Sequence, residues 1–141
     1  MSVQTLSQMA VEVLRTADGR EKTALSRAHA KTWFAARAAG QDIPLGNTAP
    51  PMQPARPPRP ELLDPRDVPR RRPGSEKGRI AMLHAVAHIE LNAVDLHWDI
   101  IARYTDTEMP IGFYDDWVKS ADEESKHFNL ISDCLEAMGS N

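Results

Sequence analysis

Prolines are concentrated in one stretch of this 141-residue chain, and this concentration limits where regular structure can form. Ten of the eleven prolines fall within residues 44–73. Each proline fixes its φ angle and removes a backbone donor, so neither a helix nor a central strand can continue through the stretch. We therefore expect residues 41–74 to form an extended Pro/Arg-rich segment. Leu62, Leu63 and Val68 give this segment apolar points that could hold it along a helical surface.

Hydrophobic spacing predicts two helices before this segment, which together make an N-terminal helical pair over residues 1–40. The first helix lies within residues 2–17. The second covers residues 20–39, with Asp18 as its N-terminal cap and Gly40 just after its end. Its expected buried stripe consists of Leu25, Ala28, Thr32, Ala35 and Ala36.

Two longer helices are predicted after the segment. The third helix starts near Ser75, and its apolar residues recur every three or four positions: Ile80, Leu83, Ala87, Leu91, Val94, Trp98 and Ile101. The fourth runs from about Phe113 to Met138, before Gly139. Residues 105–112 between them are too few for anything but an antiparallel return. Residues 75–141 are therefore expected to form a helical hairpin, and the fold class to be all-α.

Three polar residues interrupt the apolar faces of this hairpin. Glu124 is seven residues from both Trp117 and Ile131, where the periodicity predicts an apolar side chain. His127 follows one turn later on the same face. Glu90 lies beside the apolar stripe of the third helix and is expected to point toward the fourth. These three side chains are the candidate metal ligands.

A metal ion would satisfy both glutamates and the histidine at once. A buried carboxylate without compensation costs several kcal/mol, so two of them in one interface indicate a cation or a protonation shift. The single cysteine, Cys134, excludes an internal disulfide and a thiolate cluster and suits a reducing cytoplasm. Oxygen-rich ligands with one histidine favour iron or manganese over structural zinc.

Other residues offer weaker alternatives. His84 and His88 are four residues apart and could bind a metal themselves, although packing or a hydrogen bond near the site is the better interpretation. His97 shares the face of Glu90 and could be an outer-shell group. Glu123 should be solvated, because it is turned about 100° from Glu124. Trp98 and Trp117 are expected in the core rather than at a substrate site.

Charge and hydropathy argue against nucleic-acid and membrane functions. Residues 56–79 carry eight basic and four acidic groups, including the Arg70–Arg72 run, whereas residues 80–141 carry twelve acidic and three basic groups. A lone basic run without interleaved aromatics is a poor indication of nucleic-acid binding. No apolar run reaches the roughly 20 residues that span a bilayer. A cytoplasmic protein is expected.

Three sequence runs carry a resemblance to a known family. Gly78-Arg79-Ile80, the run from His84 to Leu91 and the run from Asp122 to Phe128 resemble the signature of the ferritin-like family catalogued as domain of unknown function 455. The resemblance starts at about Arg59 and covers both following helices. It implies a four-helix bundle in which two hairpins each give one Glu and one Glu-x-x-His to a di-iron or di-manganese centre.

Only half of that ligand set is present, because the family's chains are about twice as long. Glu90, Glu124 and His127 match one half, and two copies related by a two-fold axis would supply four glutamates and two histidines. The resemblance therefore predicts a homodimeric metal-binding protein, with oxygen- or peroxide-dependent oxidation as the implied reaction class. The alternatives are a non-catalytic helical interaction module and a truncated half of a larger ferritin-like protein.

Overall fold

The computed structural model describes residues 4–57, 74–107 and 109–140, and these residues form four α-helices and no strand. The helices are α1 (Leu6–Arg15), α2 (Gly19–Ala38), α3 (Glu76–Arg103) and α4 (Ile111–Ala137). The all-α prediction is confirmed for this part of the chain, and each helix lies within a few residues of its predicted bounds. None of the described helices is long and apolar enough to cross a membrane.

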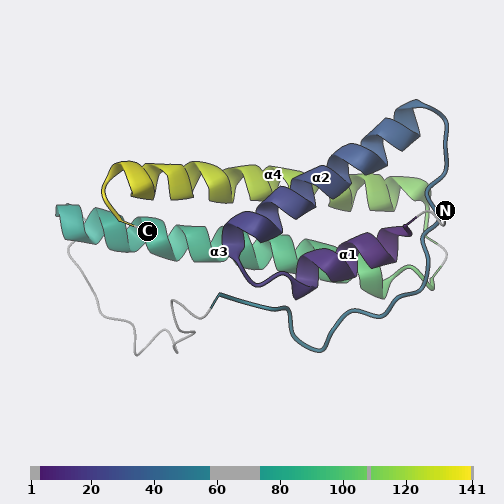
Figure 1. The fold of residues 1–141 in the computed structure, drawn as a ribbon, viewed down its shortest axis with the longest axis horizontal. Helices are drawn as coiled ribbons and strands as arrows, with labels where there is room; N and C mark the ends of the chain where they lie inside the picture. The colour runs from purple at the N-terminus through teal and green to yellow at the C-terminus, as the bar shows by residue number, and fades with distance from the viewer. Residues whose placement is uncertain (1–3, 58–73, 108, 141) are drawn as a thin grey trace.

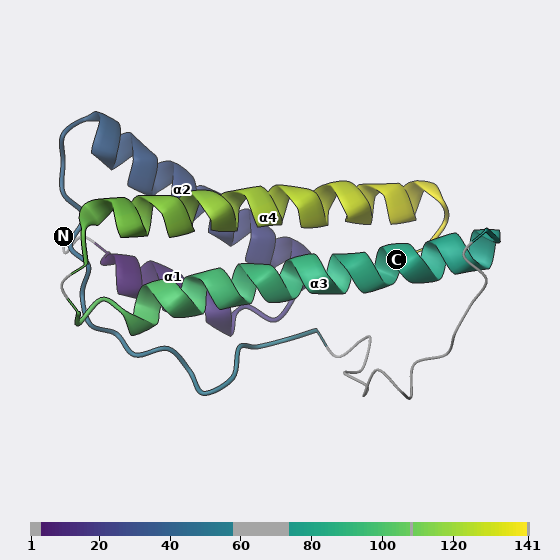
Figure 2. The same cartoon turned by 180° about the vertical axis from the view of Figure 1, so that it is seen from behind.

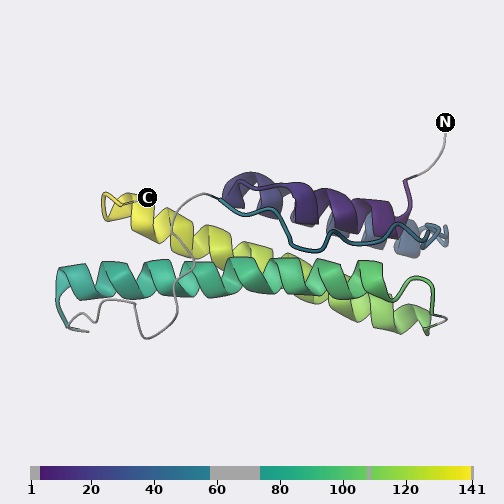
Figure 3. The same cartoon turned by 90° about the horizontal axis from the view of Figure 1, so that it is seen from below.

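The helices form two layers. α3 and α4 run antiparallel, side by side along their length (Figure 2). α1 and α2 lie together on one side of this pair, with α1 against α3 and α2 across α4 (Figure 3). One face of the α3–α4 hairpin is therefore covered, and the opposite face has no described element against it.

Local capping explains where the helices begin and end. Asp18 Oδ2 accepts a hydrogen bond of 2.9 Å from the backbone N–H of Glu21, as predicted for the start of α2. Ser75 caps α3 in the same way. Gly40 and Gly139, which follow α2 and α4, have φ angles of 70° and 78°. This left-handed conformation is strained for other residues, so glycine favours termination at both places.

A single core joins the two layers. Its largest fully buried aromatic side chains are Trp33 of α2, Trp98 of α3 and Tyr114 of α4. α1 contributes its apolar face, which includes Leu6, Val13 and Leu14. Trp98 is a core residue as predicted, whereas Trp117 is only partly buried against the core.

The described part of the proline-rich segment lies along α1 (Figure 1). The carbonyl oxygens of Pro44 and Leu45 accept hydrogen bonds from the amides of Leu6 and Ser7, both at 2.9 Å. Further along, the Ala55 amide donates to the carbonyl of Leu14 at the end of α1, at 2.7 Å. Residues 41–57 contain no helix or strand and are attached to α1 by these hydrogen bonds.

Two expectations about the proline-rich segment lie outside the described residues. They concern the apolar points Leu62, Leu63 and Val68 and the basic run Arg70–Arg72. The attachment of residues 41–57 to α1 consequently rests on other residues than those predicted.

The predicted buried stripe of α2 is wrong. Ala28, Thr32 and Ala35 are exposed. The buried line instead contains polar residues, among them Lys22, Ser26 and His29, together with Ala30 and Trp33. These polar groups are tolerated because partners on other helices satisfy them, for example Ser26 Oγ, which accepts from Trp98 Nε1 at 2.8 Å.

Candidate metal centre

The structure brings the three predicted ligands together on the seam between α3 and α4. His127 Nδ1 lies 3.6 Å from Glu124 Oε2 and 3.7 Å from Glu90 Oε2. One ligand atom from each residue can be chosen so that all three lie within 4.8 Å of one another. These separations are longer than hydrogen bonds, so the three groups face a shared point without bonding to each other.

Helix geometry explains this convergence. Glu124 and His127 are three residues apart on α4 and therefore project from the same face. Glu90 is turned roughly 100° from the buried Leu91 but only about 40° from the buried Val94, so its side chain lies at the edge of the buried face of α3. The antiparallel packing of α3 against α4 places the two faces opposite each other.

Burial differs across the cluster. The side chains of Glu90 and Glu124 are 20% and 25% exposed, whereas His127 is 54% exposed. Glu90 Oε2 is completely buried and has no hydrogen-bond partner within the described structure. A buried carboxylate oxygen in this condition is costly unless a cation compensates it. The seam between α3 and α4 is therefore closed to solvent at Glu90 Oε2 and open to solvent at His127. His127 is more exposed than the sequence predicts.

His97 lies further along the same seam but is not directed at the cluster. Its Nδ1 is 2.5 Å from the Ala93 carbonyl oxygen, and its Nε2 is 2.7 Å from Ser120 Oγ. Burial lowers the pKa of His97, and the hydrogen bond to Ala93 opposes part of this shift. The imidazole packs edge-on against Trp117. Both ring nitrogens are thus engaged away from the three candidate ligands.

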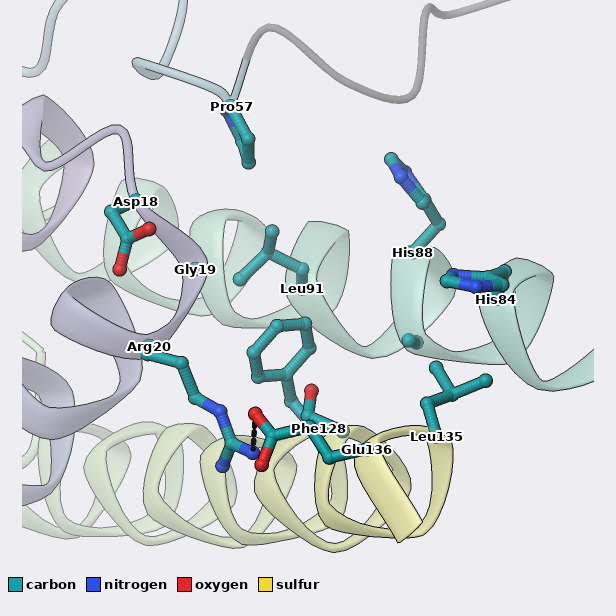
Figure 4. Close-up of a pocket in the computed structure, with 12 residues that line it drawn as sticks. Asp18, Gly19, Arg20, Pro57, His84, His88, Leu91, Phe128, Leu135 and Glu136 are labelled. Carbon is teal, nitrogen blue, oxygen red and sulfur yellow. Dashed lines mark hydrogen bonds and ion pairs between the residues drawn. The ribbon is translucent and has the colours of Figure 1, made fainter. Parts of the chain in front are cut away.

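His84 and His88, the other two histidines considered as ligands, lie at a pocket rather than in the cluster. His84 and His88 line a pocket of about 290 Å³ between the start of α2 and the hairpin (Figure 4). Burial is the main cause that lowers the pKa of His88, and the charges of Arg56 and His84 add to it. Glu123 is exposed, as predicted.

An apolar row borders the cluster on the uncovered face of the hairpin. Met82, Ile89 and Leu96 are seven residues apart on α3, and their exposed fractions are 54%, 62% and 57%. Leu130 of α4 is 66% exposed. Residues at this spacing share one helix face, and Ile89 is turned roughly 160° from the buried Leu91. These four residues are called the open row below.

A buried ion pair was not predicted from the sequence. Lys22 Nζ lies 2.5 Å from Asp95 Oδ1 and also donates to the Val13 carbonyl oxygen at 3.1 Å. Burial is the main cause that lowers the pKa of Lys22 and raises that of Asp95. The pair joins α2 to α3 on the covered side of the hairpin. The one signal in the sequence was an acid directly after Val94, inside an apolar stripe.

Comparison with known proteins places the chain in a family without a described activity. The chain is 42% identical over 102 residues to an uncharacterized protein of Haemophilus influenzae, a match that covers 69% of this chain and 34% of the relative. The chain thus spans about a third of that relative. No solved structure matches the chain significantly. The family described as protein of unknown function (DUF455) matches residues 15–141, which extends the resemblance from about Arg59 back into α1. This chain belongs to that family.

Proposed function

We propose that Glu90, Glu124 and His127 are one half of the ligand set of a carboxylate-bridged two-metal centre that binds iron or manganese. The observation that carries the proposal is the meeting of two carboxylates and an imidazole around one point, where Glu90 Oε2 is buried without a hydrogen-bond partner. Two carboxylates and one imidazole form a donor set that suits iron or manganese.

Each ligand has a distinct place in this proposal. Glu124 shares one face of α4 with His127 and is the proposed bridging carboxylate. Glu90 holds its oxygen in the dry part of the seam, and the exposed His127 binds from the open side. When bound, such ions would exchange electrons with dioxygen or peroxide, so oxidation of a bound substrate or of iron itself is the proposed reaction class.

A second copy of the chain supplies the other half of the centre in this proposal. Three ligands are too few for two metals, and the cluster lies at the edge of the open row. An isologous two-fold contact brings the same patch of each copy together, so it would cover both open rows and double the ligand set. The proposed setting is a homodimer in the cytoplasm, to which a single free cysteine is suited.

Metal-linked stability tests the centre. Anaerobic loading with Fe²⁺ should give one metal per chain by elemental analysis and a dimer with two metals in native mass spectra. Metal that binds the folded state raises the unfolding temperature, and Glu124→Ala or His127→Ala should abolish this rise. Glu123→Ala is the matched control, because Glu123 is adjacent but exposed, and it should keep the full effect.

The same measurements separate the rival function. A non-catalytic helical interaction module would also use the open row, but it would show no metal-dependent stabilisation. If iron and manganese both fail to bind stoichiometrically, or if Glu123→Ala is as damaging as Glu124→Ala, the metal centre is wrong. If iron does bind, oxidation chemistry is tested separately, by adding oxygen to the iron-loaded protein and following its absorbance.

A further inference from the structure

A pocket lies at the step where α2 begins. α3 and α4 extend beyond the start of α2, so the layer of α1 and α2 leaves this end of the hairpin uncovered (Figure 1). The pocket of about 290 Å³ occupies this step. It faces the side of the hairpin that carries α1 and α2, whereas the metal cluster lies toward the open row. Leu91 and Phe128, which line the pocket, are each next in sequence to a candidate ligand.

The floor of the pocket is apolar. Ala87 and Leu91 of α3 and Phe128 and Leu135 of α4 form it, and the ring of Phe128 lies at its centre (Figure 4). An aromatic ring with aliphatic neighbours offers a flat apolar surface for another ring. A ligand that uses this floor must be largely apolar.

Gly19 allows α2 to begin close to this floor. A Cβ atom at position 19 would lie 2.7 Å from Phe128 Cζ and 3.5 Å from Leu91 Cδ2. Any side chain here would displace Phe128 or push α2 away. The glycine thus fixes the depth of the pocket on its α2 side.

Two imidazoles form the wall opposite α2 (Figure 4). His84 and His88 are one helical turn apart on α3. His84 Nε2 is 2.8 Å from Ser140 Oγ, so part of its hydrogen-bonding capacity is used. A neutral imidazole has one donor and one acceptor nitrogen, which matches a hydroxyl group that can donate and accept.

Each charged side chain of the lining, Asp18, Arg20 and Glu136, already has a partner. Arg20 Nη2 lies 2.7 Å from Asp133 Oδ1 and 3.1 Å from Glu136 Oε1. Asp18, on the same side, caps α2 through the Glu21 amide. Arg20 is the only arginine or lysine in the described lining and is already paired. Arg56, whose charge acts on His88, lies outside this lining and donates to Asn92 Oδ1, so the lining itself offers an anion no free cation. A cation would have to compete with Arg20 for Glu136 and with the Glu21 amide for Asp18.

We propose that this pocket binds a small neutral molecule with an apolar ring and a hydroxyl group, with the ring on Phe128 and Leu91 and the hydroxyl at the imidazole wall. Pockets of this kind, apolar with a few converging polar groups, are the usual sites of small ligands. The proposal goes beyond the metal centre and does not depend on it, because none of the three candidate ligands lines the pocket.

The test uses the whole chain, freed of metal by EDTA, and three probes of nearly equal size. Benzyl alcohol is neutral, benzoate is an anion and benzylammonium is a cation. Titrations followed by NMR should show one site for benzyl alcohol, with a dissociation constant at least about tenfold lower than for either charged probe. Shifted resonances should map to Phe128, His84 and His88. Equal binding of all three probes, or shifts that map elsewhere, would overturn the proposal.

Variants provide the second part of the test. Ser132→Leu should fill the pocket from α4 and abolish binding of benzyl alcohol, whereas Glu123→Leu adds the same side chain at an exposed position outside the pocket and should leave binding unchanged. His88→Leu should remove the preference for benzyl alcohol over toluene. Thermal unfolding checks that each variant is folded. Full binding by folded Ser132→Leu would refute the assigned site, and the wild-type NMR map decides the matter if that variant does not fold.

Discussion

Lys22 and Asp95 form an ion pair inside the protein, with Nζ and Oδ1 2.5 Å apart and the two side chains 0% and 5% exposed. The pair ties the first turn of α2 to the middle of α3, and Lys22 also bonds the carbonyl oxygens at the end of α1. Asp95 Oδ2 is buried without a hydrogen-bond partner in the described structure. Each charge is therefore compensated mainly by the other, and the pair links α1, α2 and α3.

Removal of one side chain of the Lys22–Asp95 pair should destabilise the protein much more than removal of both. Lys22→Met leaves the Asp95 carboxylate buried without a cation, and we expect a loss of roughly 3–5 kcal/mol in the free energy of unfolding. The double variant Lys22→Met/Asp95→Leu replaces the pair by apolar side chains and should recover most of this loss. Urea unfolding of the wild type and both variants measures the difference. A single variant that loses less than about 1 kcal/mol would show that the pair is not isolated from solvent.

Gly19→Ala should destabilise the protein, because its new methyl group would meet the ring of Phe128 at 2.7 Å. Overpacking of this kind costs about 1–3 kcal/mol. Gly112→Ala is the matched control on α4, since a Cβ there meets nothing within 4 Å. That control should be neutral or stabilising by up to about 1 kcal/mol. Chemical denaturation compares the two, and equal effects would contradict the close contact.

The open row should determine the oligomeric state. Leu96→Lys places a charge in the proposed dimer contact without touching Glu90, and the dimer dissociation constant should rise at least about tenfold. Metal-dependent stabilisation should weaken with it, since the second half of the ligand set is then lost. Met52→Lys is the control, because Met52 is fully exposed on the extended segment. Sedimentation equilibrium measures both variants, and a dimer that tolerates Leu96→Lys uses another surface.

Stability should fall on mild acidification through His97. Its pKa is lower in the folded protein than the ordinary value of 6.5, so the unfolded chain binds more protons between the folded-state pKa and 6.5. The free energy of unfolding therefore decreases as the pH falls through this window and levels off below the folded-state pKa. His97→Gln should flatten this part of the profile. Urea unfolding between about pH 8 and pH 5 tests it, and an unchanged slope in the variant would assign the effect to other groups.

The positions of the helices could be predicted from local sequence, because caps and apolar spacing act over a few residues. Asp18, Gly40 and Gly139 mark helix ends as expected. The meeting of Glu90 with Glu124 and His127 could also be predicted, since a short turn leaves an antiparallel hairpin little choice of register. Whether a metal binds there stays a prediction.

The packing of α2 could not be predicted in the same way. Its buried line is polar, and the partners that make burial tolerable come from distant helices. Trp33 Nε1 donates to Asp115 Oδ1 at 2.8 Å, across 82 residues of sequence, and Ser125 Oγ donates to Ser26 Oγ at 2.8 Å, across 99. Helical periodicity considers the apolar residues of one helix and cannot detect hydrogen bonds between distant helices. The pocket could not be predicted for the same reason, because it forms only where the start of α2 lies over Phe128 of the distant α4.

The hydrogen bonds from the amides of Leu6 and Ser7 to the carbonyls of Pro44 and Leu45 couple the beginning of α1 to the extended segment. A helix of ten residues normally frays from its first turn. Here the two amides become available to solvent only after residues 44 and 45 have lifted away. The Leu6 and Ser7 amides should therefore exchange with deuterium in the same opening event. Their exchange rate should equal the rate at which residues 44 and 45 detach from α1.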